Sequence, residues 1–345
     1  MLQIICVGDL CCDLIVPYGK MKEALASGDI SKETTGSLQV VMQCGGSVGN
    51  VARHLGRMEA HPVFVTPLRK DSLGEFLSSG MEESGVDMRW TAPSEKSNMY
   101  CVAVLDESGE RTMFCFVPPW ADFPRFQAES FREVPGFSGM GTFLSADASG
   151  VSDRGEVLFT SGMAILDDAE NNAAVLRFFR DRKGSGAKIV FDLNVRAESY
   201  GYEGERRRAM EEMIALSDVV LGSGREEFCQ VTGRHDIREA AEQLLLRGAG
   251  TVVARDGGRP VLILGRDEAG GAAEAAGGDG GNEEALRSGM TGTWIPVKPV
   301  RPVSTLGAGD SFDAKFLCCI ASGEEISAAV REASDYAADY ISGKK

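Results

Sequence analysis

Apolar runs and amphipathic stretches alternate along most of the chain, and this pattern predicts strands alternating with helices. From about residue 156 onwards the alternation is regular and predicts strands at residues 157–160, 188–192, 218–221, 251–255 and 261–264. Segments with helical periodicity lie between these strands, at about residues 171–182, 203–216 and 237–247. This order is typical of an α/β fold, with a parallel sheet covered by helices on both faces.

The first half of the chain has a less regular pattern. The apolar pattern of residues 2–7 predicts a buried strand that ends at Gly8-Asp9. Residues 17–37 are polar, so we expect this segment to be an excursion, a stretch that leaves the main body of the fold. The glycine-rich residues 44–47 lead into a helix with one apolar stripe. Two extended runs, 99–105 and 111–117, are joined by the polar residues DESGE and predict a β-hairpin.

The last third of the chain contains an unusual segment. Residues 265–292 are acidic and rich in glycine and alanine, so we expect a disordered surface insertion there. A strand-like run follows at residues 293–303. A helical region that is broken near Gly323 then occupies residues 311–341.

Composition narrows the class of protein. The chain has 345 residues, 43% of them hydrophobic and 25% charged, as in globular proteins. A net charge of −15 argues against a nucleic-acid partner. No run of 18 apolar residues predicts a membrane span, and the amino terminus lacks a basic leader. Nine cysteines lie largely in apolar runs without a C-x-x-C pair, so we expect buried free thiols and a cytoplasmic protein.

The segment STLGAGD at residues 304–310 carries the strongest chemical signal. It lies between a strand and an amphipathic helix, where a Gly-Ala-Gly turn can direct backbone N–H groups at an anion. Asp310 would lie beside that anion and could accept a proton from an attacking hydroxyl. The alternative is that Asp310 only caps the helix, which would stabilise it by about 1 kcal/mol.

Two further features in the first fifty residues suit a polyol. The segment GGSVGN at residues 45–50 offers backbone N–H groups, and Asn50 offers both a donor and an acceptor. Asp13 can accept two hydrogen bonds from neighbouring sugar hydroxyls. The alternatives are a plain helix entry with a solvated Asn50 and a surface carboxylate at Asp13.

In order and spacing, these segments resemble the PfkB (ribokinase-like) carbohydrate kinase family. The resemblance runs almost from end to end, and the GAGD segment is its most specific part. It rests on Gly8-Asp9 with Asp13, Gly45-Gly46 with Asn50, Asp71-x-x-Gly74, ESGVD at 83–87, the strand at 157–162, Asp192-x-Asn194-x-Arg196, Glu227 with Thr232-Gly233, and GAGDSF at 307–312.

The resemblance implies a three-layer α/β/α fold with a mostly parallel sheet and a small β-strand lid, formed by segments of about 11–43 and 96–118. It implies ATP and Mg²⁺ as cosubstrate and metal, a sugar-like acceptor, and one kinase domain over residues 1–345. By the same resemblance, Asp310 is the general base. The acceptor would be held by Asp13, Gly45, Gly46 and Asn50. The anion hole would be formed by the backbone of Gly307, Ala308 and Gly309. Glu227 would hold Mg²⁺ through water, while Arg255, Gly257 and Thr305 would flank the nucleotide. The resemblance also allows a homodimer through the lid.

Three residues depart from the family pattern. Ser304 stands where an aspartate is usual, which leaves a monovalent-cation requirement undecided, and Gly224 replaces the asparagine of an Asn-x-x-Glu motif. Lys315 replaces a glycine and either binds phosphate or faces neighbouring helices, the interpretation that we favour. One alternative to a sugar kinase is a nucleoside kinase of the same fold, which shares the same apparatus. The other, motivated by these three residues, is a binding paralogue with impaired catalysis. The GGSV segment lacks the lysine found in family relatives that take phosphorylated sugars, so the resemblance favours an unphosphorylated sugar or sugar acid.

Overall fold

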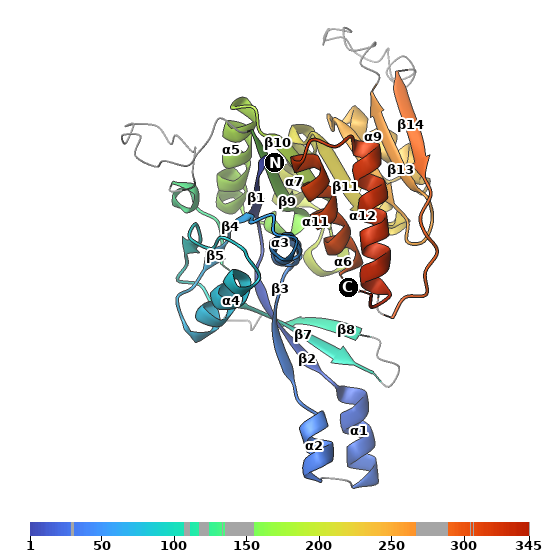
Figure 1. Ribbon diagram of the computed structural model, residues 1–345. Helices are drawn as coiled ribbons and strands as arrows, with labels where there is room; N and C mark the ends of the chain where they lie inside the picture. The colour runs from blue at the N-terminus through green and yellow to red at the C-terminus, as the bar shows by residue number, and fades with distance from the viewer. Residues whose placement is uncertain are drawn as a thin grey trace.

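The structure is a computed structural model in which the main sheet, its covering helices and a projecting second sheet are all visible (Figure 1). It describes residues 1–28, 31–106, 111–116, 124–132, 134, 155–266, 289–303, 305 and 307–344. Residues 267–288, which make up most of the predicted insertion, lie outside the described residues, whereas Gly265 and Arg266 end a strand. In the described part, no helix has the length and apolar character that crossing a bilayer requires.

The main sheet has eight strands in the order β14-β13-β12-β11-β10-β9-β1-β4. All pairings from β4 to β12 are parallel, and the last two strands are added antiparallel at one edge. The strands are β1 (Gln3–Val7), β4 (Val63–Val65), β9 (Glu156–Ser161), β10 (Lys188–Asp192), β11 (Val219–Ser223), β12 (Thr251–Arg255), β13 (Val261–Arg266) and β14 (Met290–Ile295). The mostly parallel α/β fold is thus confirmed.

Helices cover both faces of this sheet, because successive side chains of each strand point to opposite faces. In β1, Ile4 and Cys6 belong to one buried apolar cluster, while Ile5 and Val7 belong to the other. The first cluster packs under α3 (Ser47–Arg57), α4 (Ser72–Glu83), α11 (Ala308–Ala321) and α12 (Ile326–Ile341). The second packs under α5 (Ala169–Gly184), α7 (Gly204–Leu216), α8 (Arg225–Thr232) and α9 (Ile237–Leu246). These three layers follow from the sequence pattern.

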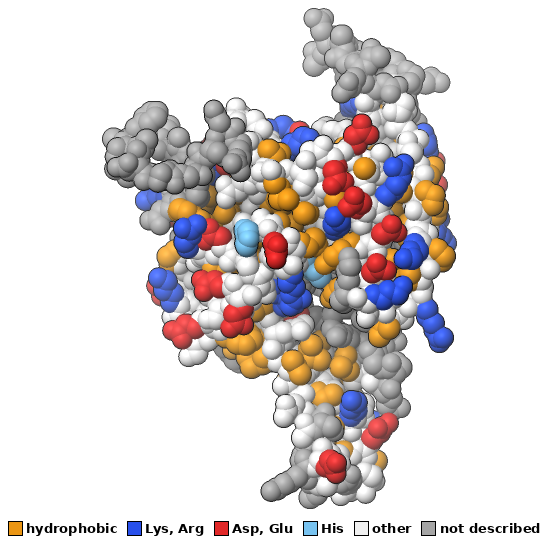
Figure 2. Space-filling model, in the orientation of Figure 1, with side chains coloured by type: hydrophobic (Ala, Val, Ile, Leu, Met, Phe, Trp, Pro, Cys, Tyr) orange, Lys and Arg blue, Asp and Glu red, His pale blue; other side chains and the backbone are white. Residues whose placement is uncertain are grey.

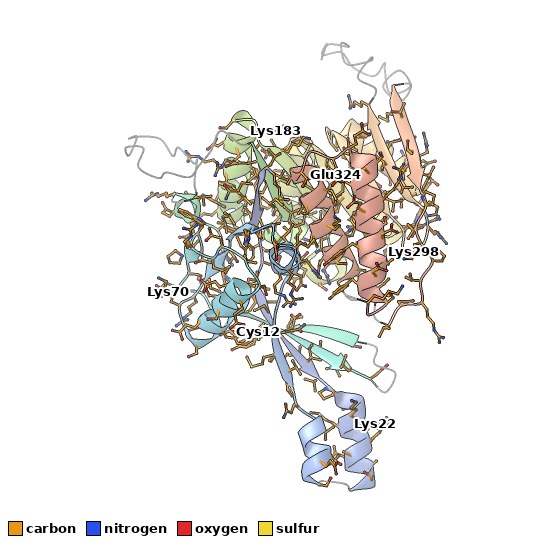
Figure 3. All side chains as sticks on the ribbon, viewed as in Figure 1. Cys12, Lys22, Lys70, Lys183, Lys298 and Glu324 are labelled. Atoms are coloured by element: carbon orange, nitrogen blue, oxygen red, sulfur yellow. The ribbon has the colours of Figure 1, made fainter. Side chains whose placement is uncertain are left out.

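A separate four-stranded sheet, here called the lid sheet, has the order β3-β2-β7-β8. It contains β2 (Cys11–Val16), β3 (Val41–Gly45), β7 (Met99–Leu105) and β8 (Arg111–Phe116), and the antiparallel pairing of β7 with β8 confirms the predicted hairpin. Cys12 lies where the lid sheet leaves the main body (Figure 3). Short pieces complete the fold: β5 (Pro67–Leu68), β6 (Ala92–Pro93), α6 (Ala197–Tyr200), η1 (Ala128–Phe131) and η2 (Gly162–Ala164).

The polar excursion at residues 17–37 contains helices, which the sequence pattern did not indicate. These are α1 (Tyr18–Ser27) and α2 (Lys32–Ser37), and they project from the far end of the lid sheet (Figure 1). The first of them ends at Gly28, whose φ of 67° lies in the left-handed region that glycine adopts freely. The excursion is therefore a helical extension of the lid.

The strand expected at residues 293–303 is shorter and begins earlier than the sequence pattern indicates. β14 ends at Ile295, immediately before Pro296, and two further prolines follow within seven positions, at 299 and 302. A proline has no N–H group to donate to a neighbouring strand, so the ladder cannot continue through them.

The described cysteines are free, and six of them are buried: Cys6, Cys11, Cys12, Cys44, Cys101 and Cys319. This agrees with the expectation that they serve as small apolar side chains.

Candidate active site

The proposed site residues converge where the carboxyl ends of the main strands meet the amino end of α11. Asp9 follows β1, Asp192 ends β10 and Arg255 ends β12, while Asp310 lies in the first turn of α11. In parallel α/β sheets, ligands bind at this edge because loops and helix amino ends gather there. The lid sheet joins the body at the same edge through β2 and β3.

The turn at residues 307–310 positions Asp310 inside the helix. Gly307 precedes the helix with a φ of 73°, and a Cβ there would also approach the Tyr340 ring at 3.2 Å, so glycine is required. The helix begins at Ala308, and no side chain caps it. Asp310 therefore does not act as the helix cap, which excludes the alternative that the sequence left open. Its Oδ2 instead accepts a hydrogen bond from Asn50 Nδ2 at 2.9 Å.

The surroundings of Asp310 change its acidity. Burial raises the pKa of this carboxyl to about 7, and the charges of Asp192 and Asp9 add to the increase, whereas the hydrogen bond from Asn50 opposes it. A carboxylate with a pKa of about 7 is a much stronger base than a solvated one and still ionises at neutral pH. Asp310 therefore has the acidity that suits a general base.

The four candidate acceptor residues lie together at the junction of lid and body. Asp13 is buried on β2, and a Cβ on Gly45 would lie 2.3 Å from its carboxyl carbon. Gly46 has a φ of 92° and a Cβ there would meet the Asp9 carbonyl oxygen at 2.7 Å. Both glycines thus allow close approach of backbone and carboxylates. Asn50, one turn into α3, bridges from this cluster to Asp310.

Asp9 holds the amino end of α3 in place. Its two carboxylate oxygens accept hydrogen bonds from the backbone N–H groups of Ser47, at 2.7 Å, and Val48, at 3.1 Å. On the other side, the Ser47 hydroxyl accepts a hydrogen bond from Asn194 Nδ2 at 2.6 Å. These contacts fix the direction in which Asn50 points, because Asn50 lies on the same first turn.

Arg255 lies beneath the turn at residues 307–310. Its guanidinium donates to Asp192 Oδ1 at 3.0 Å, to Asp313 Oδ1 at 2.6 Å and to the carbonyl of Gly309 at 3.3 Å. The Arg255 side chain is only 8% exposed and also donates to the carbonyl of Gly222. Its polar atoms are thus engaged with protein groups, so it supports the turn from within the fold.

Glu227 has an environment that suits an indirect metal contact. One carboxylate oxygen accepts from the backbone N–H of Val195 at 3.0 Å and the other from that of Ser223 at 2.7 Å. Burial raises the pKa of Glu227 to about 7, and the nearby Asp192 charge adds to this effect. A carboxylate oxygen keeps acceptor capacity beyond one N–H group, so this side chain can still receive a hydrogen bond from metal-bound water.

Comparison with known proteins decides the family. The sequence model of the pfkB family carbohydrate kinases matches residues 1–136 and 146–344, which is nearly the whole chain. The chain belongs to the pfkB family of carbohydrate kinases. It is therefore an ATP-dependent sugar phosphotransferase, as the resemblance implied.

The relatives of this chain include sugar kinases, and solved structures share its fold. A fructokinase of Vibrio alginolyticus is 23% identical over 85% of this chain and 80% of its own length. A 5-dehydro-2-deoxygluconokinase of Shouchella clausii is 25% identical over 86% of this chain and 80% of its own. The fold is similar to that of fructokinase from Vibrio cholerae O395 with fructose, ADP and calcium bound, with a TM-score of 0.71, 22% identity, and coverage of 99% and 93%.

Two of the three departures have a structural explanation in this kinase. Gly224 precedes α8 with a φ of 85°, and its N–H donates to the carbonyl of Arg255, so the position takes a conformation that favours glycine. Lys315 pairs with Glu332 of α12 at 2.6 Å and so faces the neighbouring helix, in agreement with the interpretation favoured from the sequence. Ser304 lies outside the described residues.

The remaining nucleotide-side candidates lie on turns. Gly257, with a φ of 60°, belongs to the turn after β12, where Asp256 forms ion pairs with Arg225 and Arg259. Thr305 is exposed, and its carbonyl accepts from the N–H of Ala308. Both adjoin the turn at residues 307–310: Gly257 lies two residues after Arg255, which donates to the carbonyl of Gly309, and Thr305 lies two residues before Gly307.

The sequence reasoning did not single out Asn194 and Arg196 as site residues. Their φ angles, 29° and 41°, are strained for residues with a side chain, and such strain concentrates at functional sites. Burial raises the pKa of Asp9, Asp192 and Asp310, and the positive charge of Arg196 opposes this shift in all three. The exposed Arg196 guanidinium thus lies within electrostatic reach of the three carboxylates. The motif Asp192-x-Asn194-x-Arg196 directly after a strand was the available signal.

Proposed function

We propose that this kinase transfers the γ-phosphoryl group of ATP to a hydroxyl of a small unphosphorylated acceptor, with Asp310 as general base. Asp13, Gly45, Gly46 and Asn50 hold the acceptor, and the backbone of Gly307, Ala308 and Gly309 forms the anion hole. The observation that carries this proposal is the hydrogen bond between Asn50 and Asp310, residues 260 positions apart in the chain. It joins the acceptor segment to the base.

The proposed chemistry balances as an in-line transfer. The acceptor hydroxyl gives its proton to the Asp310 carboxylate while its oxygen bonds to the γ-phosphorus, and ADP leaves with the electron pair of the broken P–O bond. Backbone N–H groups at the start of α11 and the guanidinium of Arg196 would stabilise the charge on the transferred group. Positioning and charge stabilisation supply most of the rate in this reaction class.

Mg²⁺ fits the donors that the chain presents. When bound, the ion would neutralise phosphate charge. Glu227 would hold its water shell, because the two backbone N–H groups fix the carboxylate without exhausting its lone pairs. Arg255, Gly257 and Thr305 would flank the nucleotide, Arg255 through its support of the Gly309 carbonyl.

A screen of acceptors tests this function. Purified protein with Mg·ATP should release ADP in the presence of at least one of ribose, fructose, 2-keto-3-deoxygluconate and a set of nucleosides, with and without potassium. Release that requires an acceptor supports the proposal. If calorimetry detects acceptor binding while no acceptor stimulates ADP release, the chain is a binding paralogue, and the proposed catalysis is wrong.

Two features count against impaired catalysis. Gly224 has a positive φ, and its N–H donates to the backbone carbonyl of Arg255. Lys315 is paired with Glu332 and not with the turn at residues 307–310. A nucleoside kinase is the second candidate. An aminoimidazole riboside kinase of Salmonella typhimurium, 24% identical over 83% of this chain, is among the relatives. A cavity beside Asp9, lined mainly by apolar side chains such as Met99, Phe126 and Met163, favours an acceptor of that general kind.

A further inference from the structure

Arg206 is a buried arginine without an acidic partner. It lies in the first turn of α7 and is only 2% exposed. The other buried arginines of the described chain, Arg182 and Arg255, each form an ion pair with a carboxylate, whereas no described carboxylate pairs with Arg206. Taking a charge out of water is costly, so a buried guanidinium of this kind needs hydrogen bonds to several acceptors.

The Arg206 guanidinium donates to four backbone carbonyls from two segments. Its Nε donates to Ile165 at 2.9 Å and its Nη2 donates to Gly162 at 3.1 Å, both in the segment that follows β9. Nη2 also donates to Val195 at 2.7 Å, and Nη1 donates to Gly201, both in the segment between β10 and α7. A planar group with N–H donors in fixed directions can join two segments in this way, whereas a lysine ammonium cannot reproduce the fork.

The two segments also touch each other directly. A Cβ on Gly162 would collide with the carbonyl oxygen of Leu193 and would lie 3.3 Å from that of Asn194, so the close approach requires glycine. The guanidinium carbon of Arg206 lies 5.7 Å from the centre of the Tyr200 ring, which is within the range of a cation–π contact. Arg206 therefore closes a tight junction between the segments.

The part of this junction that reaches the site is the strained run of Asn194, Val195 and Arg196. Its φ angles of 29° at Asn194 and 41° at Arg196 persist only where the surrounding contacts over-determine them. The Val195 N–H donates to Glu227, and the Val195 carbonyl accepts from Arg206. The Nε of the exposed Arg196 donates to Asn194 Oδ1 at 2.9 Å, so the direction of its guanidinium follows the backbone of this run.

We propose that Arg206 is a positioning residue, which holds this strained run in place so that the Arg196 guanidinium meets the phosphoryl group during transfer. The inference rests on the proposed role of Arg196 in stabilising the transferred charge, and it extends that role to a residue that touches no substrate. A misplacement of about 1 Å can cost about 10²-fold in rate. Loosening the junction should therefore lower kcat more than it changes KM.

A double-mutant cycle tests whether Arg206 acts through Arg196. Arg206→Lys keeps the charge and loses the fork, so it should lower kcat about tenfold or more while KM for Mg·ATP changes less than about threefold. In the Arg196→Ala background the same substitution should change kcat less than about twofold, because the group that Arg206 positions is gone. Arg182→Lys is the matched control, since this buried arginine pairs with Glu156 at the end of β9 that is remote from the site. It should leave kcat unchanged in both backgrounds.

The outcomes separate this inference from the proposed function. If Arg206→Lys keeps the wild-type kcat, or lowers kcat equally in both backgrounds, the positioning role is wrong while the kinase chemistry stands. If no acceptor is phosphorylated, the proposed function fails, and amide hydrogen exchange decides the positioning role. A peptide covering residues 193–201 should exchange slowly in the wild type and faster in Arg206→Lys, with α9 unchanged. Fast exchange of this peptide in the wild type would overturn the proposal, whether or not Arg206→Lys folds.

Discussion

The acidity of a single carboxyl at position 310 depends on a residue from the other end of the chain. The hydrogen bond from Asn50 favours the charged form of Asp310 and so lowers a pKa that burial raises to about 7. In Asn50→Ser this contact is lost, and the pKa of Asp310 should rise further. Because the base works only when it is ionised, the acidic limb of the kcat/KM–pH profile should move to higher pH.

A pH series from about 5.5 to 9 measures this shift, with Arg57→Gln as the control, since Arg57 is an exposed residue on the same helix. An acidic limb that stays in place, or moves to lower pH, would show that Asn50 does not tune the base.

The same carboxyl should reduce the stability of the fold at alkaline pH. Its folded pKa of about 7 exceeds the unfolded value of about 3.9, so the folded state binds the proton more tightly between these values. Its contribution to stability is therefore present below about pH 4 and is lost as the pH rises through about 7. The side chain of Asp310→Asn cannot ionise. The Tm of this variant minus the Tm of the wild type should therefore be larger at pH 8 than at pH 5.

Thermal unfolding of both proteins at the two pH values measures this difference. Asp181→Asn, at an exposed position on α5, should show the same Tm difference at both values. If Asp310→Asn has no pH-dependent advantage, the carboxyl is not held in a desolvated state.

At the scale of elements, Arg255 connects three of them. It ends β12, pairs with Asp192 at the end of β10, and pairs with Asp313 on α11. Removing the guanidinium leaves two buried carboxyls facing each other. Arg255→Leu should therefore lower the free energy of unfolding by about 3–5 kcal/mol, the usual cost of breaking a buried ion pair.

Urea denaturation measures that loss, and Arg89→Gln, at an exposed ion pair, should have little effect. The double variant Arg255→Leu/Asp313→Leu should recover part of the loss, because it removes one uncompensated carboxyl. Equal stability of Arg255→Leu and wild type would mean that the ion cluster does not hold α11 against the sheet.

Elements with a continuous apolar pattern were predictable from the sequence, whereas those without one were not. The strands at 188–192 and 251–255 were expected at the bounds that the structure gives, because both are buried on two faces. α2 has no apolar side chain that could mark it, and it projects away from the main body with α1. α1 has Tyr18, Met21 and Leu25 at helical spacing, a signal that the interpretation of this segment as a polar stretch overlooked. The partners of Arg255 lie 63 and 58 positions away, and only the folded arrangement brings them together.

The candidate site shows the same division between local and tertiary signals. Gly307 and the turn that it begins could be expected from residue types alone, as could the proximity of Gly45 and Gly46 to a helix start. The placement of Asp310 inside the helix, its contact with Asn50, and the strained backbone of Asn194 and Arg196 depend on packing between distant segments. Sequence periodicity does not contain that information.

At the scale of the whole molecule, the lid sheet and the residue before β3 expose apolar side chains that the rest of the described chain does not cover. Val40, Val41, Met42 and Tyr100 are each more than 40% exposed, and hydrophobic side chains gather below the main body in the space-filling view (Figure 2). Such surfaces on soluble proteins commonly mark contacts between chains. We expect a dimer formed through the lid, and Val41→Asp should shift it to monomer.

Analytical ultracentrifugation over a range of concentrations measures the mass of both proteins. Phe76→Asp, at an exposed position on α4 of the main body, should leave the mass unchanged. A wild type that sediments as a monomer at all concentrations would contradict a lid dimer.

The central claim is that Asp310 takes the proton of the acceptor hydroxyl. Its most direct test is the turnover number of Asp310→Asn, measured as ADP release with saturating Mg·ATP and the best acceptor from the screen. The account predicts a loss of kcat of about 10²–10⁴-fold, the usual contribution of a positioned base, with ATP binding preserved. A variant that retains near-normal kcat would contradict the account.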